Sequence, residues 1–227
     1  MTKSSRRDFF NIRRFGIHSS FIIRHSSFSA RRAFTLIELI VVIAIIIVLA
    51  GLILSTMGYV QKKGARARAE TEIAAISAAC ESYKADNGIY PRGPAAATTI
   101  GSTTIPANVT DSLDPRTSGD PTSTTSPTYS QASLYVYTQL SGDLTGNRQP
   151  SGKSYLTFKP SMLSPADQTQ NVQYIRDPFG NSYGYSTANQ ADPTTPKGYN
   201  PTFDLWSTDG VISTTNPPDQ SQWIKNW

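Results

Sequence analysis

An unbroken apolar run near the N-terminus constrains the fold of this chain more than any other feature. Residues 39–54 are uncharged and almost wholly aliphatic, and the wider segment 34–59 carries a single charge, at Glu38. A stretch of this length is sufficient for one helical crossing of a bilayer core. The sequence therefore predicts a membrane-spanning helix with one acidic residue near its start.

The charge of the chain is distributed unevenly around this run. The net charge is +5, but residues 1–33 contain eight basic residues and one acidic residue, whereas residues 34–227 contain 13 basic and 15 acidic residues. The basic N-terminal segment is typical of a leader rather than of folded structure. Because the more positive flank of a membrane span stays in the cytoplasm, we expect a single pass with the N-terminus inside and the C-terminal part outside.

The helix is expected to continue beyond the membrane. Residues 65–86 contain no proline and consist of good or neutral helix formers. An apolar stripe at helical spacing is formed by Ile73, Ile76, Cys80 and Tyr83. The Asn-Gly pair at 87–88 supplies a left-handed stop. We therefore divide the predicted helix into a transmembrane half, residues 34–60, and an amphipathic half, residues 61–87.

The remainder, residues 88–227, is predicted to form a small globular domain. A Thr- and Ser-rich segment, residues 93–130, lacks periodicity and is expected to be a long surface loop. A short helix is expected over residues 130–142. Strands are expected over residues 154–158, 172–177, 181–187 and 202–206. "DPFG" at 177–180 has the residues of a type I turn between the second and third of these strands. The expected fold class is α+β, with a long N-terminal transmembrane and amphipathic helix packed on a small antiparallel sheet with long loops.

The chain after residue 33 lacks the residue types that common catalytic chemistry needs. Both histidines lie in the leader, so a serine or cysteine nucleophile has no usual general base. The single cysteine, Cys80, excludes an intrachain disulfide and a cysteine-based metal cluster, and its Ala-rich context favours a small buried residue. The loop acids Asp111, Asp114 and Asp120 fit solvated turns. The sequence predicts a structural protein rather than an enzyme, and nucleic acid is not an expected partner.

Glu38 is energetically unfavourable where it stands, because a carboxylate near the bilayer interior is costly unless it is paired. If the chain is cut between Ala33 and Phe34, the new α-amino group of Phe34 lies one helical turn from Glu38. These charges pair most readily between two parallel helices that are offset along their axes, the amine of one with the acid of the next. Such a contact is heterologous and repeats without closing, so it predicts a filament.

The stretch "RRAFTLIELIVVIA" resembles the signature of type IV prepilin-like proteins. In that family a basic leader ends at a small residue, usually glycine, and a prepilin peptidase cuts before a phenylalanine that becomes N-methylated. Ala33 stands here at the glycine position. The resemblance implies cleavage between Ala33 and Phe34, methylation of Phe34 by the prepilin peptidase/N-methyltransferase, and a role for Glu38 in assembly.

Further stretches are similar to the major pseudopilin of type II secretion systems. They are "YKADNGIYP" at 83–91, "DPFGNSYGYS" at 177–186, "FDLWSTDG" at 203–210 and the terminal "NW". Departures are Ser55, where that family usually has proline, and the Thr/Ser-rich insertion. The resemblance implies a structural subunit of a pseudopilus that drives protein export. Such a subunit enters the bacterial inner membrane with its C-terminal domain in the periplasm, then forms a homopolymer through its N-terminal helices. The implied partners are the lipid bilayer before assembly, the inner-membrane secretion platform and the minor pseudopilins.

The same resemblance implies a Ca²⁺ site in the C-terminal loop. Asp209 matches a ligand position of the family, and the carbonyl of Leu205 and the side chain of Ser207 follow from the same alignment. A later acid of the family falls on Trp223, which leaves Asp219 as the candidate fourth ligand. Oxygen ligands of this kind suit a hard cation.

Two other readings remain open from the residues alone. A type IV pilin for adhesion, motility or DNA uptake shares the N-terminal signature, but more often closes its C-terminal loop with a disulfide, which a chain with one cysteine cannot form. A membrane-anchored carbohydrate-binding or hydrolytic domain would use residues 34–59 as a plain signal anchor and would keep Met1 as its N-terminus.

Overall fold

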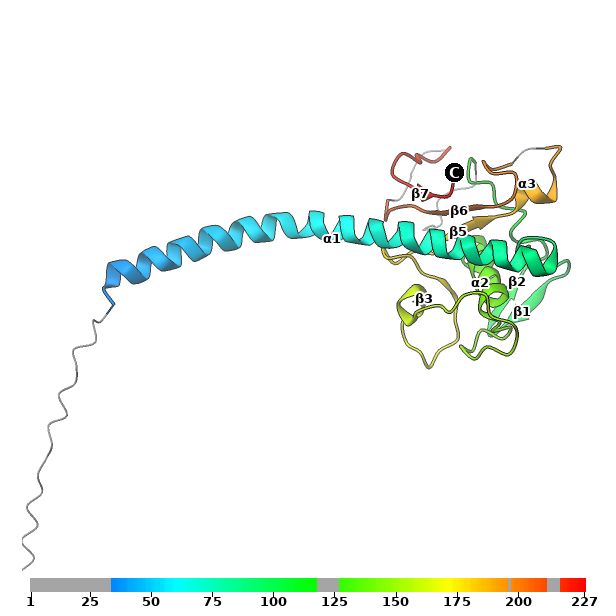
Figure 1. The fold of residues 1–227 in the computed structure, drawn as a ribbon, viewed down its shortest axis with the longest axis horizontal. Helices are drawn as coiled ribbons and strands as arrows, with labels where there is room; N and C mark the ends of the chain where they lie inside the picture. Colours follow the sequence, from blue (N-terminus) through cyan, green and yellow to red (C-terminus); the bar gives the residue numbers. More distant parts are fainter. Residues whose placement is uncertain (1–33, 118–126, 196, 212–216) are drawn as a thin grey trace, which may run out of the picture. The chain divides into compact units, whose positions relative to one another are not determined.

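The computed structural model describes residues 34–117, 127–195, 197–211 and 217–227 (Figure 1). The predicted leader, including Ala33, lies outside the described residues, as does Asp120. The chain divides into two compact units, Met1–Gly51 and Leu52–Trp227, which are described separately.

A single helix, α1 (Leu36–Asn87), confirms the prediction that the helix continues beyond the apolar run. Its last turn ends as the sequence predicts, because Gly88 has a left-handed φ of 78° and donates its N–H to the Lys84 carbonyl at 2.7 Å. Within the described residues, α1 is the helix that is long and apolar enough to cross a membrane. Every residue from 36 to 60 is exposed, so this part of the helix is available to contact lipid or protein.

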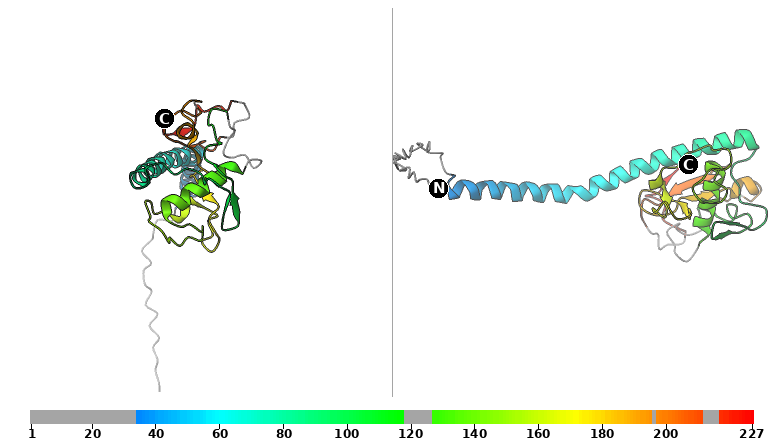
Figure 2. Two further views of the ribbon diagram at one scale, coloured as in Figure 1. Left: turned by 90° about the vertical axis from the view of Figure 1, so that its right-hand side faces the viewer. Right: turned by 90° about the horizontal axis from the view of Figure 1, so that it is seen from below.

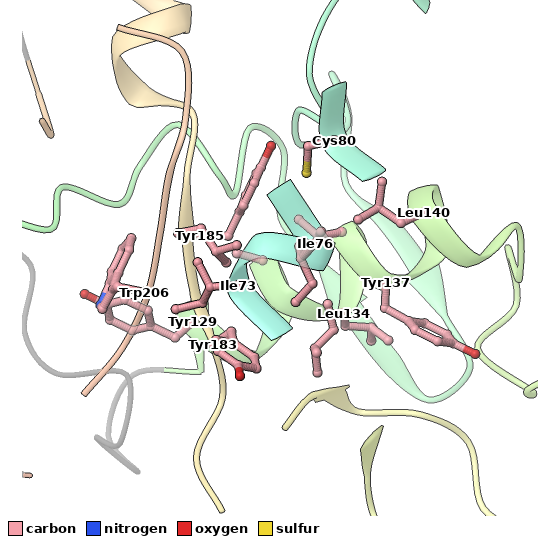
Figure 3. Packing of buried hydrophobic residues seen from close by; sticks show 14 of the residues in the cluster. Ile73, Ile76, Cys80, Tyr129, Leu134, Tyr137, Leu140, Tyr183, Tyr185 and Trp206 are labelled. Atoms are coloured by element: carbon pink, nitrogen blue, oxygen red, sulfur yellow. The ribbon is translucent and has the colours of Figure 1, made fainter. Parts of the chain in front are cut away.

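The second half of α1 carries one side of the hydrophobic core. Ile73, Ile76 and Cys80 are buried and Tyr83 packs partly buried beside them, which confirms the predicted stripe. Figure 3 shows Ile73 and Ile76 among aromatic and aliphatic side chains that include Tyr185. The helix α2 (Thr128–Ser141), close to the predicted segment 130–142, contributes further core residues on its buried face.

The sheet elements are short and antiparallel. Strands β5 (Gly184–Ser186), β6 (Asp204–Ser207) and β7 (Ile224–Lys225) form one sheet in that order, and β3 (Leu163–Ser164) pairs with β4 (Tyr174–Ile175). A 3-10 turn, η1 (Pro160–Met162), precedes β3, and a single-turn helix, α3 (Ala188–Ala191), follows β5. Figures 1 and 2 show the second half of α1 running beside α2 and the sheet that contains β6. The α+β class and the antiparallel pairing agree with the sequence prediction.

The predicted turn at residues 177–180 is present. The Gly180 N–H donates to the Asp177 carbonyl at 3.1 Å, and Arg176 and Ser182 form an antiparallel bridge on either side of the turn. The predicted strands at 172–177, 181–187 and 202–206 correspond to β4, β5 and β6, each shorter than expected.

The prediction of an unstructured surface loop over residues 93–130 was wrong in part. Strands β1 (Thr98–Ile100) and β2 (Thr103–Ile105) form an antiparallel hairpin there, and Ile105, Val109 and Leu113 are buried. Each strand is a Thr-Thr-Ile segment, and β-branched residues favour extended backbone. Gly101, with a φ of 58°, turns the chain between the strands.

The predicted strand at residues 154–158 was also wrong. Tyr155 and Leu156 donate their N–H groups to the same acceptor, the Leu140 carbonyl, at 2.7 and 3.0 Å. The segment is thus held against the C-terminal end of α2 and forms no sheet. The C-terminal segment packs against the sheet, since Trp223 stacks on Trp206 with ring centroids 5.9 Å apart.

Candidate functional site

The N-terminal motif places its acid in the first turn of α1. The N–H of Glu38 donates to the Thr35 side-chain oxygen at 3.3 Å, so Thr35 caps the helix. The N-terminal end of a helix favours negative charge, which gives Glu38 a modest stabilisation. Phe34 remains 75% exposed. Among the residues that the structure describes, the Glu38 carboxylate forms no ion pair.

The C-terminal loop contains a tight turn, residues 208–211, which we call the Asp209 turn. The Val211 N–H donates to the Thr208 carbonyl at 3.1 Å, while Asp209 and Gly210 have φ values of 59° and 72°. Two successive left-handed residues are the pattern of a type I′ turn, for which Asp-Gly is a favoured pair. The turn is packed down, because a Cβ on Gly210 would lie 3.2 Å from the Phe179 ring.

The Asp209 carboxylate is buried and lies against two cations from α1. One carboxylate oxygen, Oδ2, is 3.3 Å from Lys62 Nζ and 3.5 Å from an Arg66 guanidinium nitrogen. The same Arg66 nitrogen donates to the Gln222 carbonyl at 2.9 Å. The other oxygen, Oδ1, is buried without a hydrogen-bond partner.

A second buried carboxylate, Asp177, supports the Asp209 turn through Ser207. Ser207 Oγ donates to Asp177 Oδ2 at 2.6 Å and accepts the Asp209 N–H at 3.3 Å. Asp177 Oδ1 accepts the N–H groups of Phe179 and Asn181 at 3.0 and 2.8 Å. Burial raises the pKa of the Asp177 carboxyl above its usual value, and these hydrogen bonds oppose that shift.

Three of the four groups predicted to bind Ca²⁺ are engaged in other contacts. The Leu205 carbonyl already accepts the Asn226 N–H at 3.2 Å, and the Ser207 hydroxyl donates to Asp177. Asp219 is exposed and accepts the Ser221 N–H at 2.9 Å. The described part of the chain holds no group of three or more acidic, histidine or cysteine side chains suited to a metal. Among the described residues of this loop, Asp209 Oδ1 and the Thr208 hydroxyl are the buried oxygens without a hydrogen-bond partner. This donor set does not fit the six to eight oxygens that Ca²⁺ takes.

Sequence reasoning missed Lys62, Arg66 and the structural role of Asp177. Lys62 and Arg66 are not singled out by the sequence analysis, which treats Asp177 only as the first residue of a turn. The available signal was the four-residue spacing of Lys62 and Arg66, which places both on one face of the helix. The sequence offered no indication that this face meets residue 209.

Comparisons with known proteins define the class. Residues 28–54 match the family described as the prokaryotic N-terminal methylation motif. A chain in which this motif opens a long apolar helix that continues into a small α+β domain resembles type IV pilin-like proteins. Members of this class are structural subunits rather than enzymes, in agreement with the sequence prediction.

A particular relative extends the comparison. Over 61 residues the chain is 39% identical to the type II secretion system core protein G of Pectobacterium carotovorum subsp. carotovorum. The match covers 27% of this chain and 39% of that relative. The chain therefore spans less than half of the length of that relative. No solved structure matches the chain.

Proposed function

We propose that this protein is a structural subunit of a type II secretion pseudopilus. Prepilin peptidase cuts it between Ala33 and Phe34 and methylates Phe34. Before assembly it spans the inner membrane once, with its N-terminus in the cytoplasm and residues 88–227 in the periplasm. The methylation motif and the similarity to core protein G support this role.

The observation that carries the proposal is the Glu38 carboxylate at the start of an exposed apolar helix, where it forms no ion pair with any described residue. A carboxylate at this depth in lipid is costly, and selection would remove it if it only anchored the chain. Cleavage creates a cation at Phe34, one helical turn away. In a staggered array of parallel helices, the amine of one subunit neutralises Glu38 of the next.

The exposed helix surface supplies the contact area for assembly. Residues 36–60 present aliphatic side chains all round, so they pack equally well against lipid or against other copies of the same helix. The charge pair then decides the stagger, because it forms at one offset only. A heterologous contact of this kind extends into a helical filament. Growth of the filament from the inner-membrane platform, with minor pseudopilins, moves exported proteins outward.

The test is Glu38→Leu, expressed together with the genes of the secretion system. The variant should insert and be cleaved, because the change removes a polar group from lipid and leaves the cleavage junction intact. It should assemble far fewer filaments than the wild type, measured by shearing and electron microscopy. Glu70→Leu on the exposed face of the same helix is the matched control, with filaments expected to form. Wild-type filament yield from Glu38→Leu would overturn the proposal.

A further inference from the structure

The Asp209 turn needs positive charge, since the Asp209 side chain is only 2% exposed. We propose that Lys62 and Arg66 of α1 form an internal cation pair that neutralises Asp209, holds the turn on the helix, and takes the place of a bound divalent cation. This inference does not depend on the role in secretion. It concerns how the Asp209 turn is held against α1.

The negative charge of Asp209 is neutralised without a metal. Two single positive charges lie at 3.3 and 3.5 Å from one oxygen of Asp209, which together match the charge of one Ca²⁺. Lys62 and Arg66 are 55% and 37% exposed, so solvent screens the attraction in part, while the acid that they meet is almost fully enclosed. A buried carboxylate left without these partners would be strongly destabilising.

The pair is held in place by its own surroundings. Lys62 and Arg66 lie one turn apart on the same face of α1, so both reach the Asp209 turn. Arg66 also pairs with Glu70 at 3.4 Å and donates to the Gln222 carbonyl, which joins the segment before β7 to the same point. One guanidinium thus ties the helix to two separate parts of the C-terminal region.

Among the described residues around the Asp209 turn, a cation from solution would find few ligands. Coordination to Asp209 Oδ2 would bring it within a few ångströms of Lys62 and Arg66, and like charges at that distance repel. Asp209 Oδ1 offers one oxygen, and Asp177, the other buried acid nearby in the network, has both oxygens engaged in hydrogen bonds. Ca²⁺ would gain one carboxylate ligand at the cost of an existing ion pair.

The test is thermal unfolding of the full-length protein in detergent micelles, in millimolar Ca²⁺ and in chelator. The wild-type melting temperature should be the same in both. The double variant Lys62→Met/Arg66→Met should melt lower by roughly 5 °C or more in chelator. Lys63→Met is the matched control, because Lys63 lies over the Tyr59 ring and should be near neutral.

The triple variant, which adds Asp209→Asn to Lys62→Met/Arg66→Met, separates the ion pair from general damage. It should be more stable than the double variant, because the unpaired charge is gone. If the double variant fails to fold and the triple variant folds, the proposal is supported more strongly. The proposal is overturned if Ca²⁺ raises the wild-type melting temperature by several degrees and Asp209→Asn abolishes the rise. It is equally overturned if the double variant melts like the wild type.

Discussion

Ser207 on β6 donates a hydrogen bond to the buried carboxylate of Asp177 at 2.6 Å. The two residues are 30 positions apart, and the bond joins the turn at 177–180 to the strand that leads into the Asp209 turn. Asp177 Oδ1 meanwhile organises its own turn by accepting two backbone N–H groups. One side chain therefore fixes a turn locally and fastens it to a neighbouring strand.

Ser207→Ala should lower the free energy of unfolding by about 2 kcal/mol, the usual loss for a hydrogen bond to a charged group. The substitution leaves Asp177 Oδ2 buried without its donor and removes the acceptor of the Asp209 N–H. Thermal or denaturant unfolding in micelles measures the change. Ser154→Ala, at an exposed hydroxyl, is the control and should be nearly neutral. Equal stability of the two variants would show that the Ser207–Asp177 bond contributes nothing net.

Asp177→Asn should change how stability depends on pH. Burial raises the pKa of the Asp177 carboxyl, so the native protein holds this proton more tightly than the unfolded chain does. The stability from this group is complete below about pH 4 and is lost as the pH rises through the raised pKa. Relative to wild type, the melting temperature of Asp177→Asn should therefore improve from pH 4 to pH 7.

Asp167→Asn should change the pH dependence of stability in the opposite direction. Hydrogen bonds from Thr169 lower the pKa of the Asp167 carboxyl, so its contribution is present above the usual pKa and is lost as the pH falls through the lowered one. Relative to wild type, this variant should be less stable at pH 7 and recover toward acid pH. If the stabilities of Asp177→Asn and Asp167→Asn, each relative to wild type, changed with pH in the same direction, the assigned directions of the pKa shifts would be contradicted.

Gly184→Ala should destabilise the sheet by about 3 kcal/mol, because the space for a side chain is already filled. Gly184 lies opposite Trp206 in the β5–β6 register, and a Cβ on Gly184 would overlap the indole ring. Trp206 is fully buried and stacked on Trp223, so it cannot move aside.

Gly64→Ala is the matched control for this glycine. A Cβ at Gly64 meets nothing within 4 Å, and the residue lies inside α1. Alanine there should stabilise the helix by up to about 1 kcal/mol. Unfolding of both variants in micelles checks the contrast, and a tolerated Gly184→Ala would mean that the indole has another place to pack.

Local patterns predicted the elements whose causes are local. The helix α1 followed from the absence of breakers and from the stripe at Ile73, Ile76 and Cys80, and its end followed from the Asn-Gly pair. The turn at 177–180 followed from its residue types. These features depend on neighbours within one or two turns of chain, which a sequence displays directly.

Contacts between distant segments were not predictable in this way. Lys62 and Asp209, which form an ion pair, lie far apart in the sequence, and no periodicity relates the two positions. The β1–β2 hairpin was missed for another reason, since its Thr-rich composition resembles a flexible loop until the buried Ile105 is seen. Packing in the core, rather than local propensity, determines the structure of that segment.

Cys80 should be unreactive in the native protein. The side chain is fully buried on α1, and burial raises the pKa of its thiol well above the usual value, so the reactive thiolate is scarce. Alkylation with iodoacetamide, followed by mass spectrometry, should label Cys80 only after the protein is unfolded. Rapid labelling at neutral pH without denaturant would show that this part of α1 opens readily.

The N-terminus of assembled protein should begin at a methylated Phe34. The prediction rests on "RRAFTLIE", in which the basic residues end at Ala33, and on the matched methylation motif over residues 28–54. Intact mass and N-terminal peptide sequencing of sheared filaments should show loss of residues 1–33 and one added methyl group. Ala33→Gly, which restores the usual small residue of the family, should be cut at least as fast. Ala33→Leu, with a bulky residue at the junction, should accumulate uncut in the membrane. Filaments that contain the intact leader would contradict the processing step, and they would also remove the Phe34 amine on which the pairing with Glu38 depends.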